Sequence, residues 1–250
     1  MTETKVAEKP KGLGSTGRTD AWWLEPTLVG IGFALFIIYA TFRAFENNFY
    51  EYHQYLSPFY SPKFVFDWWK WSPAILILWI PAGFRATCYY YRKAYYRAYF
   101  MTPPACGVEG IGGYKYCGET KFPFVLQNLH RYFLYLAIVV VAVLWYDAIV
   151  AFNFDGTFGV SAVGLVMLAN VVFLSNYTFG CHAFRHLVGG KLDCFSCSST
   201  AKTRFKIWEV VTKLNEHHML WAWMSLFSVG FTDFYIRQVA AGLMPELRLF

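Results

Sequence analysis

Long apolar runs constrain this chain more than any other feature of its sequence. Five segments approach the roughly 20 residues that an α-helix needs to cross the hydrocarbon core of a bilayer. They are residues 26–42, 72–90, 124–148, 160–180 and 218–239. Only 15% of the residues are charged, whereas about a quarter are charged in a soluble domain. We therefore predict an all-α integral membrane protein with five transmembrane helices in one bundle.

The first 20 residues differ from the rest of the chain, because they are polar and rich in lysine and glycine. This composition is typical of a flexible tail and does not resemble a secretory signal. We expect a flexible cytoplasmic tail over residues 1–20 and a five-helix membrane domain over residues 21–250.

The basic residues predict how the helices are oriented. Seventeen of the 22 lysine and arginine residues lie in the tail, in residues 85–131 and in residues 181–217. Because such residues collect on the cytoplasmic side of membrane proteins, we expect the N-terminus in the cytoplasm and the C-terminus outside the plasma membrane. The net charge of +6 then suits a surface next to membrane lipid, and we expect no nucleic-acid partner.

Eleven of the twelve cysteine and histidine residues fall at the expected cytoplasmic end, and only His53 lies at the other. The eleven are Cys88, Cys106, Cys117, Cys181, Cys194, Cys197, His130, His182, His186, His217 and His218. This clustering favours a metal or redox site. Structural disulfides are not expected on a cytoplasmic face.

Four of these residues lie at a similar depth on four different predicted helices. They are Cys88, His130, Cys181 and His218. Thiolates suit zinc, copper(I) or iron–sulfur clusters, and two histidines replace two cysteines on one iron of a Rieske-type [2Fe–2S] cluster. The alternative for Cys88 is a small buried apolar side chain, and for His130 an interfacial residue that binds a headgroup.

Other ligand sets remain open. His182 and His186 are four residues apart and share one face if the helix continues. Cys194 and Cys197 form a Cys-x-x-Cys motif. Each could replace a member of the first set.

Two other chemistries are also open. A haem b needs two histidines that face each other from different helices, and His130 with His182, His186 or His218 could supply them. A membrane di-iron hydroxylase or desaturase carries histidine boxes, which His182-x-x-x-His186 and His217-His218 resemble in part. That family needs more histidines than the five on this side.

Arginine and aromatic residues near the same end are candidates for a quinone pocket. Arg85 lies one turn before Cys88, where an ionisable group usually faces the bundle or the interface. It could bind a quinone carbonyl or an anionic headgroup. Arg131, Tyr132 and Trp221 are further candidates.

One acidic residue lies within an apolar segment on the other side of the predicted membrane. Asp233 falls some fifteen residues into the fifth predicted span. We expect it to take part in proton transfer or to pair with a polar group such as Asn170.

Several segments together resemble one family over about residues 20 to 240. They are Arg85–Arg97, Pro103–Cys106, Gln127–Phe133, Cys181–Gly190 and His218–Trp223. In combination they are similar to the membrane subunit of actinobacterial succinate dehydrogenase, the haem-free type F complex II of mycobacteria.

The resemblance implies a five-helix anchor bound to a flavoprotein subunit and an iron–sulfur subunit, with no succinate site in this chain. It also implies a Rieske-type [2Fe–2S] cluster in the membrane subunit that passes electrons to menaquinone or ubiquinone. The chain is then the quinone-reducing anchor of a succinate:quinone oxidoreductase. We choose Cys88, His130, Cys181 and His218 as its cluster ligands because a site inside the membrane needs rigid, helix-borne residues.

Overall fold

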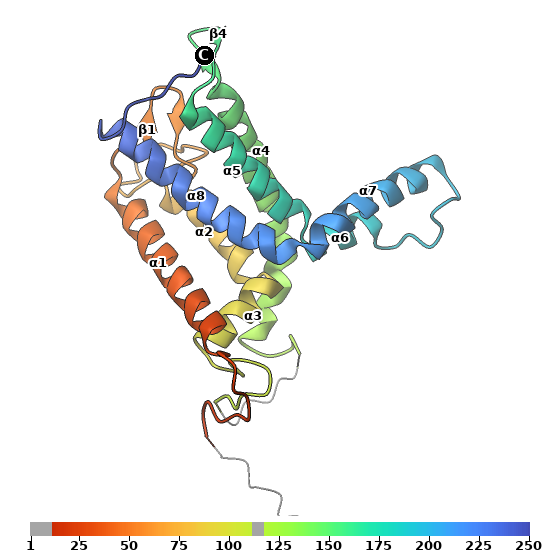
Figure 1. The fold of residues 1–250 in the computed structure, drawn as a ribbon. Coiled ribbons are helices and arrows are strands. Elements are labelled where there is room, and N and C mark those ends of the chain that lie inside the picture. The colour runs from red at the N-terminus through yellow and green to blue at the C-terminus, as the bar shows by residue number, and fades with distance from the viewer. Residues whose placement is uncertain (1–11, 112–117) are drawn as a thin grey trace, which may run out of the picture.

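Five helices pack side by side in the structure, a computed structural model that describes residues 12–111 and 118–250 (Figure 1). They are α1 (Leu24–Glu46), α2 (Ile75–Ala86), α4 (His130–Val150), α5 (Ala162–Phe179) and α8 (His218–Ala240). In this bundle α5 contacts both α4 and α8, α2 contacts α4, and α1 contacts α8. The core therefore lies between α4, α5 and α8, with α1 and α2 on its flanks.

Three helical segments of the described chain are long and apolar enough to cross a membrane. They are Leu24–Glu46, Phe124–Val150 and Ala162–Phe179, and they coincide with three of the five predicted spans. α8 is 23 residues long but includes the buried polar residues Asp233 and Arg237. The mostly helical membrane fold is confirmed, whereas length and composition establish three spans and not five.

The predicted second span, residues 72–90, is not one helix. α2 contains only 12 residues and ends at Ala86, and a new helix, α3 (Tyr89–Ala98), begins after Cys88. Cys88 itself has an extended backbone. The chain therefore turns at this cysteine. The apolar run in the sequence gives no indication of the turn.

One end of the bundle, the β1 end, is closed by short hairpins. β1 (Glu51–Tyr52) pairs with β2 (Tyr55–Leu56), and β3 (Asn153–Phe154) pairs with β4 (Thr157–Phe158), both antiparallel. The last residues of the chain add backbone hydrogen bonds here, from Val160 N to Phe250 O at 2.9 Å. These contacts hold the loops together where α1, α4 and α8 end.

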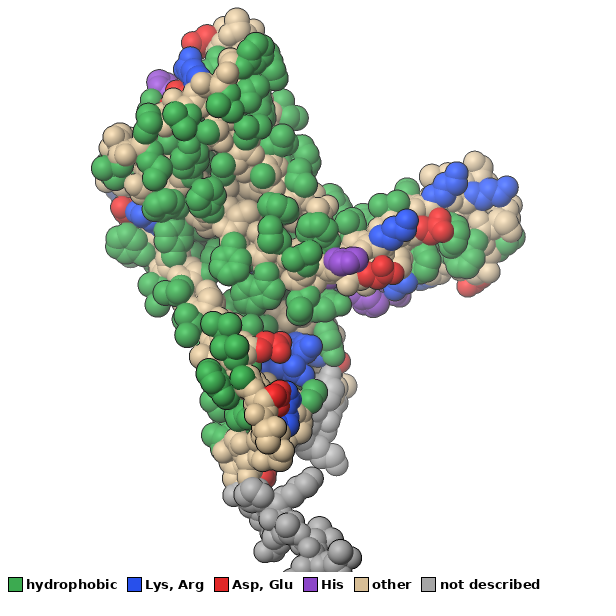
Figure 2. Space-filling model, in the orientation of Figure 1, with side chains coloured by type: hydrophobic (Ala, Val, Ile, Leu, Met, Phe, Trp, Pro, Cys, Tyr) green, Lys and Arg blue, Asp and Glu red, His purple; other side chains and the backbone are tan. Residues whose placement is uncertain are grey.

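The opposite end, the α3 end, contains α3, the 3₁₀ helix Phe124–Leu129 and the starts of α4 and α8. From it an arm formed by α6 (His182–Gly189) and α7 (Ser199–Glu216) projects away from the bundle (Figure 1). Lys, Arg and His side chains are visible along the arm in Figure 2. The arm therefore presents a polar, mostly basic surface beside the bundle.

Part of the predicted flexible tail is attached to the α3 end. Gly14 N donates to Glu109 O at 2.8 Å, Thr16 Oγ1 donates to Gly107 O at 2.7 Å, and Arg18 donates to Cys106 O at 2.8 Å. These residues thus contact the segment 106–109, and the flexible tail stays a prediction. Residues 1–11 lie outside the described part of the chain.

Apolar side chains divide between a core and an outer surface. Phe84, Leu134, Tyr177 and Leu226 pack in one buried cluster at the α3 end. The outer surface of α1 exposes large apolar side chains, namely Leu28, Ile31, Leu35, Ile38 and Phe42. Figure 2 shows that such side chains cover much of the visible face of the bundle, as expected of a surface that faces lipid.

Candidate functional site

Two cysteines occupy the same local position, a break between two helices. Cys88 lies between α2 and α3, and Cys181 lies between α5 and α6. Both have an extended backbone, with φ −69° and ψ 134° for Cys88 and φ −66° and ψ 141° for Cys181. Each side chain is 2% exposed and belongs to the core cluster at the α3 end. The breaks therefore turn both sulfur atoms into the bundle.

Two histidines also share a position, because each is the first residue of a long helix. His130 starts α4 and His218 starts α8. His218 is 1% exposed, and His130 is half-buried. All four residues chosen from the sequence thus lie at the α3 end, the two cysteines at helix breaks and the two histidines at helix starts.

The four side chains meet as two pairs of one cysteine and one histidine. The Nε2 atom of His218 lies 3.7 Å from the Sγ atom of Cys88. The Nε2 atom of His130 lies 2.9 Å from the Sγ atom of Cys181. Two thiols and two imidazoles are the donor set that a Rieske-type cluster requires.

Two aromatic rings link the two pairs, and each belongs to a residue four positions before one of the cysteines. Phe84, four residues before Cys88, stacks on His130 with ring centroids 4.7 Å apart, and Tyr177, four residues before Cys181, stacks on His218 at 5.0 Å. Phe84 and Tyr177 contact each other edge to face at 5.4 Å. The contact pattern therefore occurs twice, with each aromatic ring stacked on the histidine of the other pair.

The pairs do not form a site for a single ion. Within residues 12–111 and 118–250, no three His, Cys, Asp or Glu side chains gather closely enough to hold one metal ion. A zinc or copper ion with four ligands needs them all around one centre. In a Rieske-type cluster one iron takes both histidines and the other takes both cysteines, so the two Cys–His contacts do not by themselves assign these residues to the two irons.

One ring nitrogen at the site has no hydrogen-bond partner in the described structure. The Nδ1 atom of His218 is buried and unpaired, although buried polar atoms are almost always paired. The Nδ1 atom of His130 instead lies 3.1 Å from the Thr87 hydroxyl. Metal-binding histidines usually have such a partner on the second nitrogen, which His130 has and His218 lacks in the described structure, so the donor set fits a metal group while this outer contact is present at only one of the two rings.

The Cys181 thiol is held in its neutral form. Burial, and secondarily the neighbouring Cys88, raise the pKa of Cys181 to about 12, while the backbone N–H groups of Ala183 and Phe184 act in the opposite direction. Because a metal binds the thiolate, binding at this residue must release a proton.

Arg85 lies beside the two pairs and points toward α8. It donates to Ser225 Oγ at 3.0 Å and to the Ala222 carbonyl at 3.3 Å, and it also donates to the Tyr91 hydroxyl. Its guanidinium lies 4.7 Å from the centre of the Tyr177 ring. The positive charge is therefore only one aromatic ring away from His218.

A cavity of about 460 Å³ reaches this arginine from the middle of the bundle. Phe36 of α1, Trp79 of α2 and Val140 of α4 are among the apolar side chains that line it, and Arg85 and Tyr177 lie in its wall. Binding sites for small molecules are commonly apolar clefts of this size with a few polar groups.

The other sequence candidates lie elsewhere. Arg131 and Tyr132 are exposed, and neither they nor Trp221 line this cavity. His182 and His186 are exposed on α6. Trp221 packs against the core cluster that contains Cys88 and Cys181. Cys117 lies outside the described residues.

Cys194 and Cys197 are joined by a disulfide in the loop between α6 and α7. This differs from the expectation of no structural disulfide at this end, and it explains why neither thiol joins the buried pairs. The two cysteines are close in sequence and pair with each other before any more distant residue.

Phe84, Thr87 and Tyr177 were not among the residues chosen from the sequence. The repeated spacing of four residues between an aromatic residue and a cysteine, Phe84 to Cys88 and Tyr177 to Cys181, is a signal that could have indicated two of them.

The chain resembles known proteins over nearly its whole length. A family model described as the actinobacterial succinate dehydrogenase subunit SdhC matches residues 24–242. A chain of a solved structure, the Mycobacterium smegmatis Sdh1 complex in the apo form, is 42% identical, with 98% of this chain and 97% of that chain covered and a TM-score of 0.85. No curated protein matches the chain.

Proposed function

This chain belongs to the family of the actinobacterial succinate dehydrogenase subunit SdhC, and on that premise we propose that it is the quinone-reducing membrane anchor of a succinate:quinone oxidoreductase. The observation that carries the proposal is the pair of buried Cys–His contacts inside a membrane subunit of a redox enzyme. Succinate is oxidised elsewhere in the complex, by a flavoprotein subunit and an iron–sulfur subunit.

The proposed ligands of a Rieske-type [2Fe–2S] cluster are Cys88, His130, Cys181 and His218. When bound, such a cluster accepts and donates one electron at a time. Thr87 fixes the ring of His130 through the 3.1 Å hydrogen bond, and Cys181 gives up its proton on binding. Phe84 and Tyr177 would hold the two imidazole rings in place by stacking on them.

The two Cys–His contacts argue against the haem alternative. A haem between His130 and His218 would need a nitrogen of each ring, whereas Nε2 of His130 lies 2.9 Å from Cys181 Sγ and Nε2 of His218 lies 3.7 Å from Cys88 Sγ. The histidine-box alternative is also less well supported, because His182, His186 and His217 are exposed and do not gather with the buried pairs.

The proposed quinone site is the cavity beside Arg85. Its apolar walls suit the isoprenoid tail of menaquinone or ubiquinone, and the Arg85 guanidinium can donate a hydrogen bond to a quinone carbonyl. Charged donors make the stronger hydrogen bonds, so Arg85 would orient the quinone head and stabilise negative charge on it during reduction.

The proposed topology has five spans, with the α3 end in the cytoplasm of the cell. α2 and α8 lack the length or hydropathy of the other three spans, but they pack alongside α4 and α5 in the same bundle. Most basic residues lie at the α3 end, which supports a cytoplasmic location by the positive-inside rule. The soluble subunits of the complex would dock there.

The His130→Ala/His218→Ala double variant of the whole complex tests the ligand assignment. We expect succinate oxidation by an artificial dye to continue and quinone reduction to be lost, together with the iron and the Rieske-type EPR signal of one cluster. The matched control is His182→Ala/His186→Ala, which removes two exposed histidines from the same end. Quinone reduction that persists in the first variant would overturn the proposed ligand set.

A further inference from the structure

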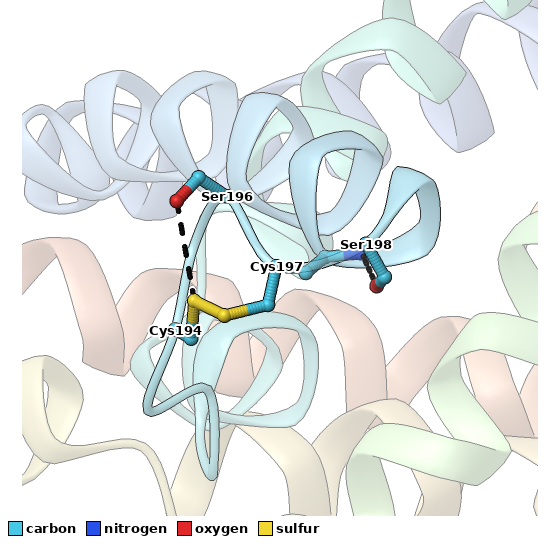
Figure 3. Close-up of a disulfide and its surroundings, with 5 residues drawn as sticks. Cys194, Ser196, Cys197 and Ser198 are labelled. Atoms are coloured by element: carbon cyan, nitrogen blue, oxygen red, sulfur yellow. Dashed lines mark hydrogen bonds between the residues drawn. A yellow bond between two sulfur atoms is a disulfide. The ribbon is translucent and has the colours of Figure 1, made fainter.

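A second redox-active group is present at the α3 end, and the proposed function does not use it. Cys194 and Cys197 are three residues apart, and a disulfide joins them with their Cα atoms 5.7 Å apart (Figure 3). This Cα separation is ordinary for a disulfide. The pair lies on the arm, whereas the buried Cys–His pairs lie inside the bundle.

The disulfide is accessible to a partner molecule. Ser196 and Cys197 are exposed, and Phe195 between the two cysteines is 48% exposed. Cys197 directly precedes Ser198, the N-cap of α7. Since α7 has 18 residues, the disulfide is about 27 Å along the helix from the start of α8. It can therefore be reached without opening the bundle.

The arm does not depend on the disulfide for its fold. Arg204 donates to the Val188 carbonyl at 2.9 and 2.7 Å and to the Gly190 carbonyl at 3.2 Å, and the rings of Phe195 and Phe205 lie 4.8 Å apart. A disulfide stabilises a fold less when the loop it closes is short. Breaking this one should leave α6 and α7 packed together, which is what a reversible site requires.

The local charges favour thiolate chemistry. Ser198 Oγ accepts a hydrogen bond from Ala201 N at 3.1 Å, which fixes the start of α7 beside Cys197. The N-terminus of a helix carries a partial positive charge, and cysteines in Cys-x-x-Cys motifs at such positions are the reactive ones in thiol–disulfide exchange. Lys202 adds a positive charge in the same region, whereas Asp193 next to Cys194 acts in the opposite direction.

We propose that Cys194 and Cys197 form a reversible thiol–disulfide site on the cytoplasmic surface, reduced by a protein that carries a dithiol. The cytoplasmic location rests on the topology proposed above. Reduction would convert the tip of the arm, beside the docking surface for the soluble subunits, from a closed loop to an open one.

The exchange proceeds in two balanced steps. A thiolate of the dithiol attacks Sγ of the exposed Cys197, the S–S bond breaks, and Cys194 leaves as a thiolate that takes up a proton. Ser196 Oγ lies 4.0 Å from Cys194 Sγ (Figure 3) and can donate to the leaving sulfur. The second thiolate of the dithiol then displaces Cys197, so two electrons and two protons pass to the cysteine pair and the dithiol becomes a disulfide.

The test is a thiol count on the folded, purified complex. One tryptic peptide, Leu192–Lys202, contains both cysteines. The complex is incubated with dithiothreitol, quenched, and labelled with N-ethylmaleimide before denaturation and digestion. We expect this peptide to carry no label before treatment and two labels after it, and to lose its reactivity again when oxidised glutathione is added. The Cys194→Ser variant should carry one label throughout.

Two results would overturn the proposal. One is a peptide that takes up label only after denaturation, which would make the disulfide structural. The other is a reduced pair that does not close again with oxidised glutathione.

The cytoplasmic location has its own test. A membrane-impermeant maleimide, applied after reduction, should label inverted vesicles and not intact cells, and the opposite pattern would refute the cytoplasmic location. These readouts are independent of quinone reduction, so they can fail without affecting the proposed ligand set.

Discussion

Helix α8 carries a buried polar cluster at each of its ends, and the two clusters differ in how fully their hydrogen bonds are used. At the α3 end, His218 contacts Cys88 through one ring nitrogen and leaves the other without a partner in the described structure. At the β1 end, Asp233 and Arg237 are 0% and 2% exposed, and each makes several hydrogen bonds.

Asp233 and Arg237 at the β1 end form hydrogen bonds with each other and with neighbouring segments. Arg237 Nε donates to both carboxylate oxygens of Asp233, at 3.0 and 2.9 Å. Asp233 also accepts from the Tyr39 hydroxyl at 2.7 Å and from Ser57. The remaining guanidinium nitrogens donate to Glu46 at 3.3 Å and to backbone carbonyls.

The comparison separates a structural cluster from a site that can bind a ligand. A buried charge pair is tolerable only when each lone pair and each proton has a partner, and a network that is fully satisfied makes the surrounding structure rigid. Such a network has no hydrogen-bond donor or acceptor left to bind a ligand. The thiols and imidazoles at the α3 end make few hydrogen bonds of their own, which agrees with the metal-binding role proposed for them.

The largest expected effect comes from breaking the ion pair between Asp233 and Arg237. Asp233→Ala leaves the Arg237 charge buried without its main partner, and we expect the free energy of unfolding to fall by about 3–5 kcal/mol. The measurement is the thermal unfolding midpoint of the purified complex. In the Asp233→Leu/Arg237→Met variant both charges are absent, and we expect stability close to wild type. A double variant as unstable as the single one would show that the ion pair itself stabilises the fold.

The second prediction concerns the α3 end, where function should change and stability should not. Thr87→Val removes the hydroxyl beside His130, and loss of such a partner typically lowers metal affinity 10–100-fold. The readout is the rate at which a chelator removes iron from the complex. Thr232→Val is the matched control, because Thr232 is also buried and also donates to a carbonyl four residues earlier, at 2.8 Å. Equal iron loss from both variants would contradict the role of Thr87.

The smallest expected effect concerns the proposed quinone site. Arg85→Gln removes the charged donor from the cavity wall, and we expect the KM for quinone to rise about tenfold, in line with the 1.5–3 kcal/mol of a hydrogen bond to a charged group. Dye-linked succinate oxidation should stay unchanged. Arg131→Gln serves as the control, since Arg131 is exposed and lies outside the cavity. If the two variants have the same KM, the quinone binds elsewhere.

The sequence was most informative where a property is summed over many residues. Hydropathy over a long window identified the three apolar helices. The positions of cysteine and histidine near predicted helix ends correctly placed four residues at one end of the bundle, namely Cys88, His130, Cys181 and His218. It was less informative at single residues. The break at Cys88 has no proline or glycine beside it, and it depends on tertiary packing and on the Thr87 hydroxyl, which donates to Gly83 O at 2.7 Å.

Partners of buried polar residues were also difficult to predict. Asp233 was expected to act in proton transfer or to pair with Asn170, but it pairs with Arg237, and Asn170 instead accepts a hydrogen bond from Ser228 at 2.8 Å. The correct partner lies four residues away on the same helix, a spacing that was visible in the sequence. The sequence could not show that Ser57, directly after β2, and Tyr39 of α1 would also be partners of Asp233.

That spacing has a consequence for how the protein is made. Charged residues strongly oppose the entry of a helix into the bilayer during synthesis. Because Asp233 and Arg237 lie one turn apart on α8, they can neutralise each other as soon as the helix forms, before any other helix is in place. In the proposed five-span topology, α8 can therefore enter the membrane as a nearly neutral unit, and later packing against α1 supplies its remaining partners.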